Sequence, residues 1–226
     1  MLNEIIFLFS IVFIAVSAIG ALYAGPVALT ALVCLQVVLM NLFVTKQILL
    51  CGMHATTADA LGIGAVLGIN LLREYYGASI ARRTVYLSFA IVIFYTIITW
   101  LQLAYVPSAC DVQQQHFIAI LGHMPRILAA SLFTYMLVES LEYYLYDYFK
   151  RIYNTRFFIA RNYGVVLVTQ LLDTILFTFL GLYGLVDNLY EIIIVSYLIK
   201  AITVIFMTPL LSACKKLIEW FEYVKV

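Results

Sequence analysis

The chain has 226 residues, of which 65% are hydrophobic and 11% are charged. Soluble domains carry about 25% charged residues, so this composition excludes a soluble enzyme or signalling domain and predicts one integral membrane domain over residues 1–226. The formal net charge of +1 offers no basic surface for nucleic acid, and no nucleic acid partner is expected.

Seven segments have the length and composition of membrane spans. A spanning helix needs about 20 mostly apolar residues. The candidates are residues 5–23, 26–44, 56–72, 85–106, 126–149, 163–185 and 189–211. We therefore predict an all-α polytopic membrane helix bundle of about seven transmembrane helices, a six-helix core plus an extra N-terminal helix, with no β-strand. The first segment lacks a positively charged start, so a retained helix is favoured over a cleaved signal peptide.

Most lysine and arginine residues fall on one side of the predicted seven-span bundle. Seven spans place ten of the thirteen basic residues on one face and only Lys46 and Arg126 on the other, with Lys200 inside a span. Cytoplasmic loops carry an excess of Lys and Arg. The pattern predicts that the N-terminus lies outside and the C-terminus in the cytoplasm.

Two further patterns concern packing and the longest outside loop. Small residues at Ala60, Gly64 and Gly68 allow close helix contact. We favour packing within the chain over docking of a partner.

The longest outside loop, residues 107–125, is polar, which suits a solvated connector better than a mobile cover over an outward-facing cavity.

The motifs of common enzymes and metal sites are missing from the sequence. It contains no HExxH, GxSxG, P-loop or GxGxxG pattern. The three histidines lack a helical i, i+4 pair, and the four cysteines are scattered without CxxC spacing, so inert thiols are expected. The chain is not expected to be an enzyme, and neither a metal nor a cofactor is expected.

Polar side chains inside the expected spans are the strongest functional signal. Glu139 and Glu142 lie in one span, and Gln170 and Asp173 lie in the next; each i, i+3 pair shares one helix face. A charge at the bilayer centre costs about 2.5–3.5 kcal/mol on insertion scales. Three carboxylates against the one internal cation, Lys200, leave a surplus that is either protonated or available to a ligand. Polar residues that only join helices are the structural alternative.

A ligand rich in N–H donors would satisfy these groups. A carboxylate accepts in parallel from a ring N–H and an exocyclic amino group, and Gln both donates and accepts. Tyr135 and Phe177 offer stacking faces for a flat heterocycle.

Several stretches resemble the queuosine precursor transporters of the vitamin uptake transporter family, which are similar to the substrate-binding components of energy-coupling-factor importers. The matching stretches lie between residues 38 and 209 and include Asn41-Leu-Phe-Val-Thr-Lys46, Glu74-Tyr-Tyr-Gly77, Pro125-Arg126, Gln170-Leu-Leu-Asp173 and Tyr197-Leu-Ile-Lys200. The resemblance implies a bacterial source and uptake of a 7-deazaguanine, either a queuosine precursor or queuine, across the cytoplasmic membrane.

The resemblance also implies a set of binding positions. Those that match the family are Asn41, Lys46, Glu74, Arg126, Gln170, Asp173 and Lys200; Asn70, Tyr135, Glu139, Glu142 and Phe177 complete the candidate set. The chain departs from the family pattern at Asn70 and Met207, where Asp is usual, and at Glu139 and Glu142, where Gln and Asp are usual. The Gln-to-Glu change is hypothesised to favour a ligand with a cationic aminomethyl arm over the neutral nitrile precursor.

The expected partners are the small-molecule substrate, the lipid bilayer, and either an energy-coupling membrane subunit or a second copy of the chain. Transport of another purine-like or vitamin substrate, a non-transporting membrane scaffold and an intramembrane enzyme are the alternatives. The absence of an ATP-binding motif leaves ion coupling, a separate partner or trapping of the substrate inside the cell as energy sources.

Overall fold

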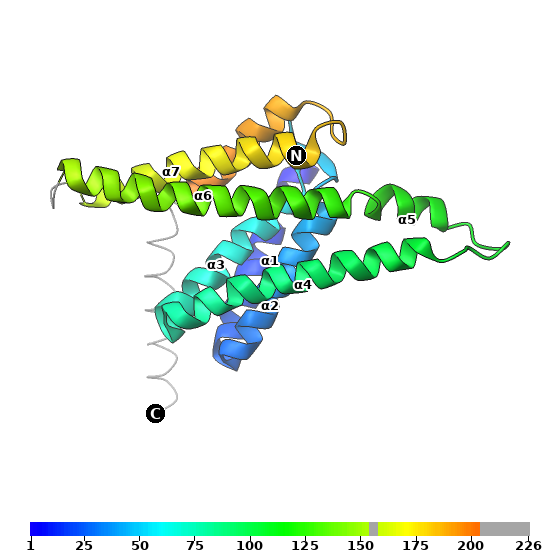
Figure 1. Cartoon of the computed structure of the whole chain (residues 1–226), viewed down its shortest axis with the longest axis horizontal. Coiled ribbons are helices and arrows are strands. Elements are labelled where there is room, and N and C mark those ends of the chain that lie inside the picture. The colour runs from blue at the N-terminus through cyan, green and yellow to red at the C-terminus, as the bar shows by residue number, and fades with distance from the viewer. Residues whose placement is uncertain (154–157, 204–226) are drawn as a thin grey trace.

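The protein is a bundle of long helices (Figure 1). The computed structural model describes residues 1–153 and 158–203, with side chains except at residues 139, 142, 143, 146, 147, 149–153 and 158–163. The helices are α1 (Leu2–Ala24), α2 (Pro26–Phe43), α3 (Ala58–Tyr76), α4 (Ala78–Ala104), α5 (Gln114–Leu121), α6 (Met124–Tyr153) and α7 (Phe158–Phe177). The π-helical turn η1 (Thr178–Leu182) continues α7, and residues 189–203 are helical.

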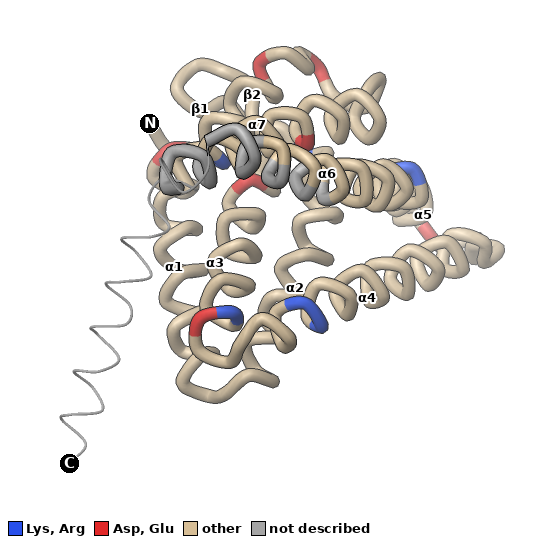
Figure 2. The backbone as a smooth tube through the Cα atoms, turned by 60° about the vertical axis from the view of Figure 1, so that its left-hand side comes forward, with Lys and Arg blue, Asp and Glu red and all other residues tan. Residues whose placement is uncertain are grey.

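The prediction of an all-α membrane bundle is confirmed. Each of the seven expected segments is mostly helical, although the end of the last one, residues 204–211, lies outside the described residues. Within the described chain, five helical segments are long and apolar enough to cross a membrane: Leu2–Ala24, Pro26–Phe43, Ala78–Ala104, Gln114–Val138 and Gly164–Leu182. Figure 2 shows long uncharged stretches of backbone, with most of the charges near helix ends.

Two boundaries differ from the prediction because a single residue connects α3 and α4. Gly77 has φ 94°, a conformation that favours glycine, and it ends α3 and precedes α4 directly. Helix α4 therefore begins at residue 78 instead of 85, and Arg82 and Arg83 lie in its second turn instead of in a loop. The loop predicted over 107–125 contains the short helix α5.

Helices α1, α2 and α3 pack closely around an apolar core. The core consists of small and branched side chains: Ala18, Leu22, Leu29, Val33, Leu67, Leu71, Leu72 and Ala81. Added Cβ atoms at Gly64 and Gly68 would collide with the side chains of Ile14 and Val33. The small residues of α3 thus serve packing within the chain, as the sequence predicts.

A two-stranded hairpin joins α2 to α3, so the prediction of a chain without strands is wrong at this point. Strands β1 (Gln47–Leu50) and β2 (Met53–Thr56) pair antiparallel around Cys51 and Gly52, which have φ of 51° and 84°. Positive φ at both central residues is the geometry of the tight hairpin turn that matches strand twist. The strands are four residues each, too short for their alternation to stand out beside the apolar spans.

Helices α6 and α7 form a second group that lies across α1–α3 (Figure 1). They run antiparallel in contact with each other, and α6 also contacts α2 and α4. The side chain of Arg126 fixes the start of α6 to the π-helical turn, because its Nε donates to the carbonyl of Leu180 at 2.9 Å. Single π-helical turns of this kind are rare and often lie at functional sites.

Candidate functional site

The two helix groups enclose a cavity of about 620 Å³. Helices α2, α3 and α4 contribute one side, and α6, α7, η1 and residues 189–203 contribute the other. Most of its wall is apolar, with a limited set of polar side chains: Asn41, Thr56, Asp59, Asn70, Ser88, Ser131, Thr134, Gln170, Asp173, Thr174, Thr178, Ser196, Lys200 and Thr203. An apolar pocket of this size with a few placed polar groups is the usual form of a small-molecule site.

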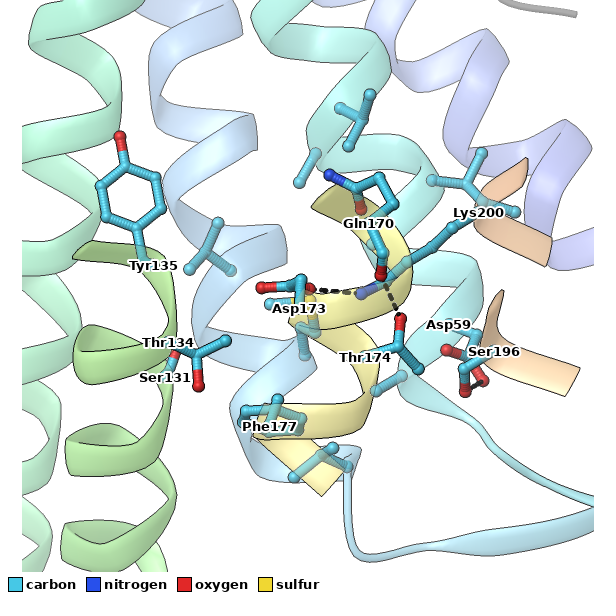
Figure 3. A pocket seen from close by; sticks show the side chains of 18 of the residues that line it. Asp59, Ser131, Thr134, Tyr135, Gln170, Asp173, Thr174, Phe177, Ser196 and Lys200 are labelled. Atoms are coloured by element: carbon cyan, nitrogen blue, oxygen red, sulfur yellow. Dashed lines mark hydrogen bonds and ion pairs between the residues drawn. The ribbon is translucent and has the colours of Figure 1, made fainter. Parts of the chain in front are cut away.

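An ion pair links α7 to the last helical segment at the cavity wall. Lys200 Nζ lies 2.6 Å from Asp173 Oδ2, and the two side chains are 33% and 29% exposed. Figure 3 shows one Asp173 oxygen on Lys200 and the other turned away from it. The pair neutralises Asp173 and leaves its second carboxylate oxygen available as an acceptor.

Three further side chains of α7 face the same space. Gln170 precedes Asp173 by three residues, and both line the cavity with Thr174 and Phe177. The Thr174 hydroxyl donates to the Gln170 backbone carbonyl at 2.8 Å. Within the described chain the Gln170 side-chain amide has no hydrogen-bond partner, so it can both donate to and accept from a ligand.

The start of α3 contributes a carboxylate that sequence reasoning missed. Asp59 Oδ2 accepts from the Thr56 hydroxyl at 3.1 Å and from the Ser196 hydroxyl at 3.0 Å. Asp59 also lies in the first turn of α3, where the helix dipole favours a negative charge. Its position inside the expected span 56–72 is the signal that could have found it.

Helices α4 and α6 supply aromatic and hydroxyl groups to the wall. The rings of Phe89 and Tyr135 are in tilted contact, with centroids 4.7 Å apart. Ser131, one turn before Tyr135, and Thr134, directly before it, also line the cavity. Thr134 is 1% exposed, and its hydroxyl has no hydrogen-bond partner in the described structure. A buried hydroxyl without a partner costs free energy, which a ligand that forms a hydrogen bond to it would recover.

The structure brings together seven of the twelve candidate residues. Those that line the cavity are Asn41, Asn70, Tyr135, Gln170, Asp173, Phe177 and Lys200. Lys46, Glu74 and Arg126 are exposed and do not line it. Glu139 and Glu142 belong to α6, but their side chains lie outside the described residues.

The charge pattern can serve a polar ligand. Among the described residues that line the cavity, the ionisable acids and bases are Asp59, Asp173 and Lys200, so the wall holds one more carboxyl group than it has basic side chains. Fixed acceptors in a low-dielectric space hold an N–H donor more strongly than water does. The arrangement suits a flat molecule that presents several N–H groups and an aromatic face.

The chain is similar to known membrane transporters. Residues 56–214 match the family described as "Putative vitamin uptake transporter". The chain is 32% identical over 198 residues to the "Probable queuosine precursor transporter" of Bacillus subtilis (strain 168), covering 86% of each chain. No solved structure matches it.

Proposed function

The chain belongs to the vitamin uptake transporter family, and from this premise we propose that it imports a 7-deazaguanine, either a queuosine precursor or queuine, across the cytoplasmic membrane. The similar Bacillus subtilis protein bears the name of a queuosine precursor transporter. The observation that carries the proposal is the cavity between the two helix groups, in which Gln170 and Asp173 share one face of α7.

Asp173 and Gln170 would read the edge of the heterocycle. A guanine-like edge presents a ring N–H and an exocyclic amino group beside a carbonyl, and a carboxylate next to an amide complements this order of donors and an acceptor. Lys200 holds Asp173 Oδ2 at 2.6 Å, which orients the carboxylate before the substrate arrives. Ordering in advance lowers the entropic cost of binding.

Aromatic side chains would hold the plane of the substrate. Phe89 comes from α4 on one side of the cavity, and Tyr135 and Phe177 come from α6 and α7 on the other. Stacking of a base on an aromatic ring contributes about 1–3 kcal/mol. Asn41 and Asn70, on α2 and α3, would add hydrogen bonds at the opposite wall.

The proposal also covers the orientation of the chain in the membrane and the source of energy for uptake. The bias of basic residues predicts that the N-terminus lies outside. With that orientation the hairpin of β1 and β2 and the Arg126–Leu180 contact would cover the outer end of the cavity. The driving force would come from ion coupling, an energy-coupling membrane subunit, or trapping of the substrate inside the cell.

Uptake in a host that lacks its own carrier tests the proposal. Cells carrying the gene should accumulate a labelled aminomethyl or nitrile 7-deazaguanine above the level of empty-vector cells. Unlabelled 7-deazaguanines should compete, and adenine should not. If the cells accumulate only another purine or a vitamin, that compound is the substrate and the proposed 7-deazaguanine is wrong. A protein that reaches the membrane without transporting any of these compounds would favour the scaffold alternative.

A further inference from the structure

Resting on the proposed function, we propose that Thr56, Asp59 and Ser196 form a second subsite in the cavity that binds a cationic amine carried by the substrate. Thr56 ends β2, Asp59 lies in the first turn of α3, and Ser196 belongs to the helical residues 189–203. All three line the cavity that holds Gln170 and Asp173.

The geometry of this cluster leaves acceptors open. Both hydroxyls donate to the same oxygen of Asp59, Oδ2, at 3.1 and 3.0 Å. In the described structure no side chain donates a hydrogen bond to Oδ1, and no basic side chain lies within salt-bridge distance of Asp59. Figure 3 shows Asp59 and Ser196 beside each other, apart from the contact between Asp173 and Lys200. The two hydroxyl-bearing residues are 3% and 6% exposed, so the cluster is fixed by its surroundings.

The chemistry of the cluster fits an ammonium group. An ammonium has three N–H donors and no acceptor, while a carboxylate oxygen and two hydroxyl oxygens each accept. The only described cation in the cavity wall, Lys200, already contacts Asp173. A cationic substrate would therefore pair with the ionised Asp59 carboxylate, whereas a neutral substrate would leave this buried carboxyl without a cation and so favour its protonated form.

The two subsites lie at a spacing that one small molecule can bridge. Ser196 and Lys200 are four residues apart on one helix, which corresponds to a rise of about 6 Å. Ser196 contacts Asp59, and Lys200 contacts Asp173. A bicyclic ring on Asp173 and Gln170 would thus direct a short amine-bearing arm toward Asp59.

A local structural role for Asp59 makes a different prediction. An acidic residue in the first turn stabilises the helix through its dipole, and its loss would weaken binding of every ligand equally. A role in carrying a coupling ion would likewise lower uptake of every substrate. Only an amine subsite changes the preference between a cationic and a neutral ligand.

Binding to the purified full-length protein distinguishes these roles. The probes are the aminomethyl 7-deazaguanine, which is cationic, and the nitrile 7-deazaguanine, which is neutral. We expect Asp59→Asn to weaken binding of the cationic probe by about tenfold to a hundredfold, the range for a hydrogen bond to a charged group, and that of the neutral probe by less than about twofold. Ser196→Ala should weaken the cationic probe by a smaller factor in the same direction.

The control variant is Asp187→Asn, which removes an exposed carboxylate outside the cavity and should leave both affinities unchanged. Equal weakening of both probes by Asp59→Asn, or no change in either, would overturn the amine subsite while leaving the proposed function intact. Failure of the wild-type protein to bind either probe would overturn the proposed function and the subsite with it. Retained binding of the neutral probe shows that the Asp59 variant is folded.

Discussion

Two parts of the molecule differ in the side chains that their helices carry. The first is the α1–α3 bundle, and the second is the cavity wall formed by α7 and residues 189–203. In the bundle, glycines and branched apolar side chains such as Gly68 and Val33 fill the space between helices. In the wall, Gln170, Asp173 and Lys200 face a cavity that no described side chain fills. The difference teaches that stability depends on the side chains packed between α1, α2 and α3, whereas recognition depends on the polar side chains that face the cavity, so substitutions in the two sets should have separate effects.

Loss of the carboxylate at Asp173 should have the largest effect on function. Asp173→Asn removes a charged acceptor, whose hydrogen bonds to a ligand are worth about 1.5–3 kcal/mol, so uptake at low substrate concentration should fall by about tenfold to a hundredfold. Initial rates are measured in the carrier-deficient host, with the amount of protein in the membrane quantified. Uptake close to the wild-type level, from a variant that folds poorly, would mean that the ion pair only joins helices.

A methyl group added to α3 inside the α1–α3 bundle should reduce the stability of the protein, with little change in its substrate preference. Gly68→Ala places a Cβ against the Val33 side chain, and overpacking of this kind costs about 1–3 kcal/mol. The measurement is the thermal unfolding midpoint of the purified protein. The matched control is Gly62→Ala on the same helix, where the added Cβ would lie 3.6 Å from Met40 Sδ, an ordinary contact. Equal loss in both variants would contradict the packing argument.

Glu139→Gln tests the departure from the family pattern on α6. Removing this charge should shift preference from the aminomethyl toward the nitrile ligand by up to about tenfold, equivalent to 1.4 kcal/mol. Competition uptake assays with the two ligands give the ratio. A wild-type protein that prefers the nitrile, together with unchanged selectivity in the variant, would refute the hypothesis.

The smallest effect is expected at the aromatic contact between α4 and α6. Phe89→Leu keeps the wall apolar but removes the tilted ring contact with Tyr135, worth about 0.5–1.5 kcal/mol. Because this contact orients the Tyr135 ring on which the substrate is proposed to stack, its loss should lower substrate affinity by roughly twofold to tenfold, read from the concentration dependence of uptake. A loss as large as that of Asp173→Asn would show that stacking, not the carboxylate, dominates recognition.

The helices were predictable because a run of about 20 mostly apolar residues is enough to indicate a membrane-spanning helix. Lipid cannot hydrogen-bond the backbone, so a long apolar run must form a helix. The spacing of Gln170 and Asp173 likewise gave their shared face, because helix geometry is local. The hairpin was not predictable in this way, since two four-residue strands depend on pairing with each other and on the turn at Cys51 and Gly52.

The sequence by itself determined the membrane bundle, the close packing along Gly64 and Gly68, and the polar face of α7. Only the tertiary structure decided which polar residues meet. Asp59 and Ser196 are 137 residues apart and Asp173 and Lys200 are 27 apart, and no local periodicity links residues on different helices. The same packing leaves Lys46, Glu74 and Arg126 outside the cavity. Contacts between helices depend on how whole surfaces fit together, and this fit is a property of the folded chain.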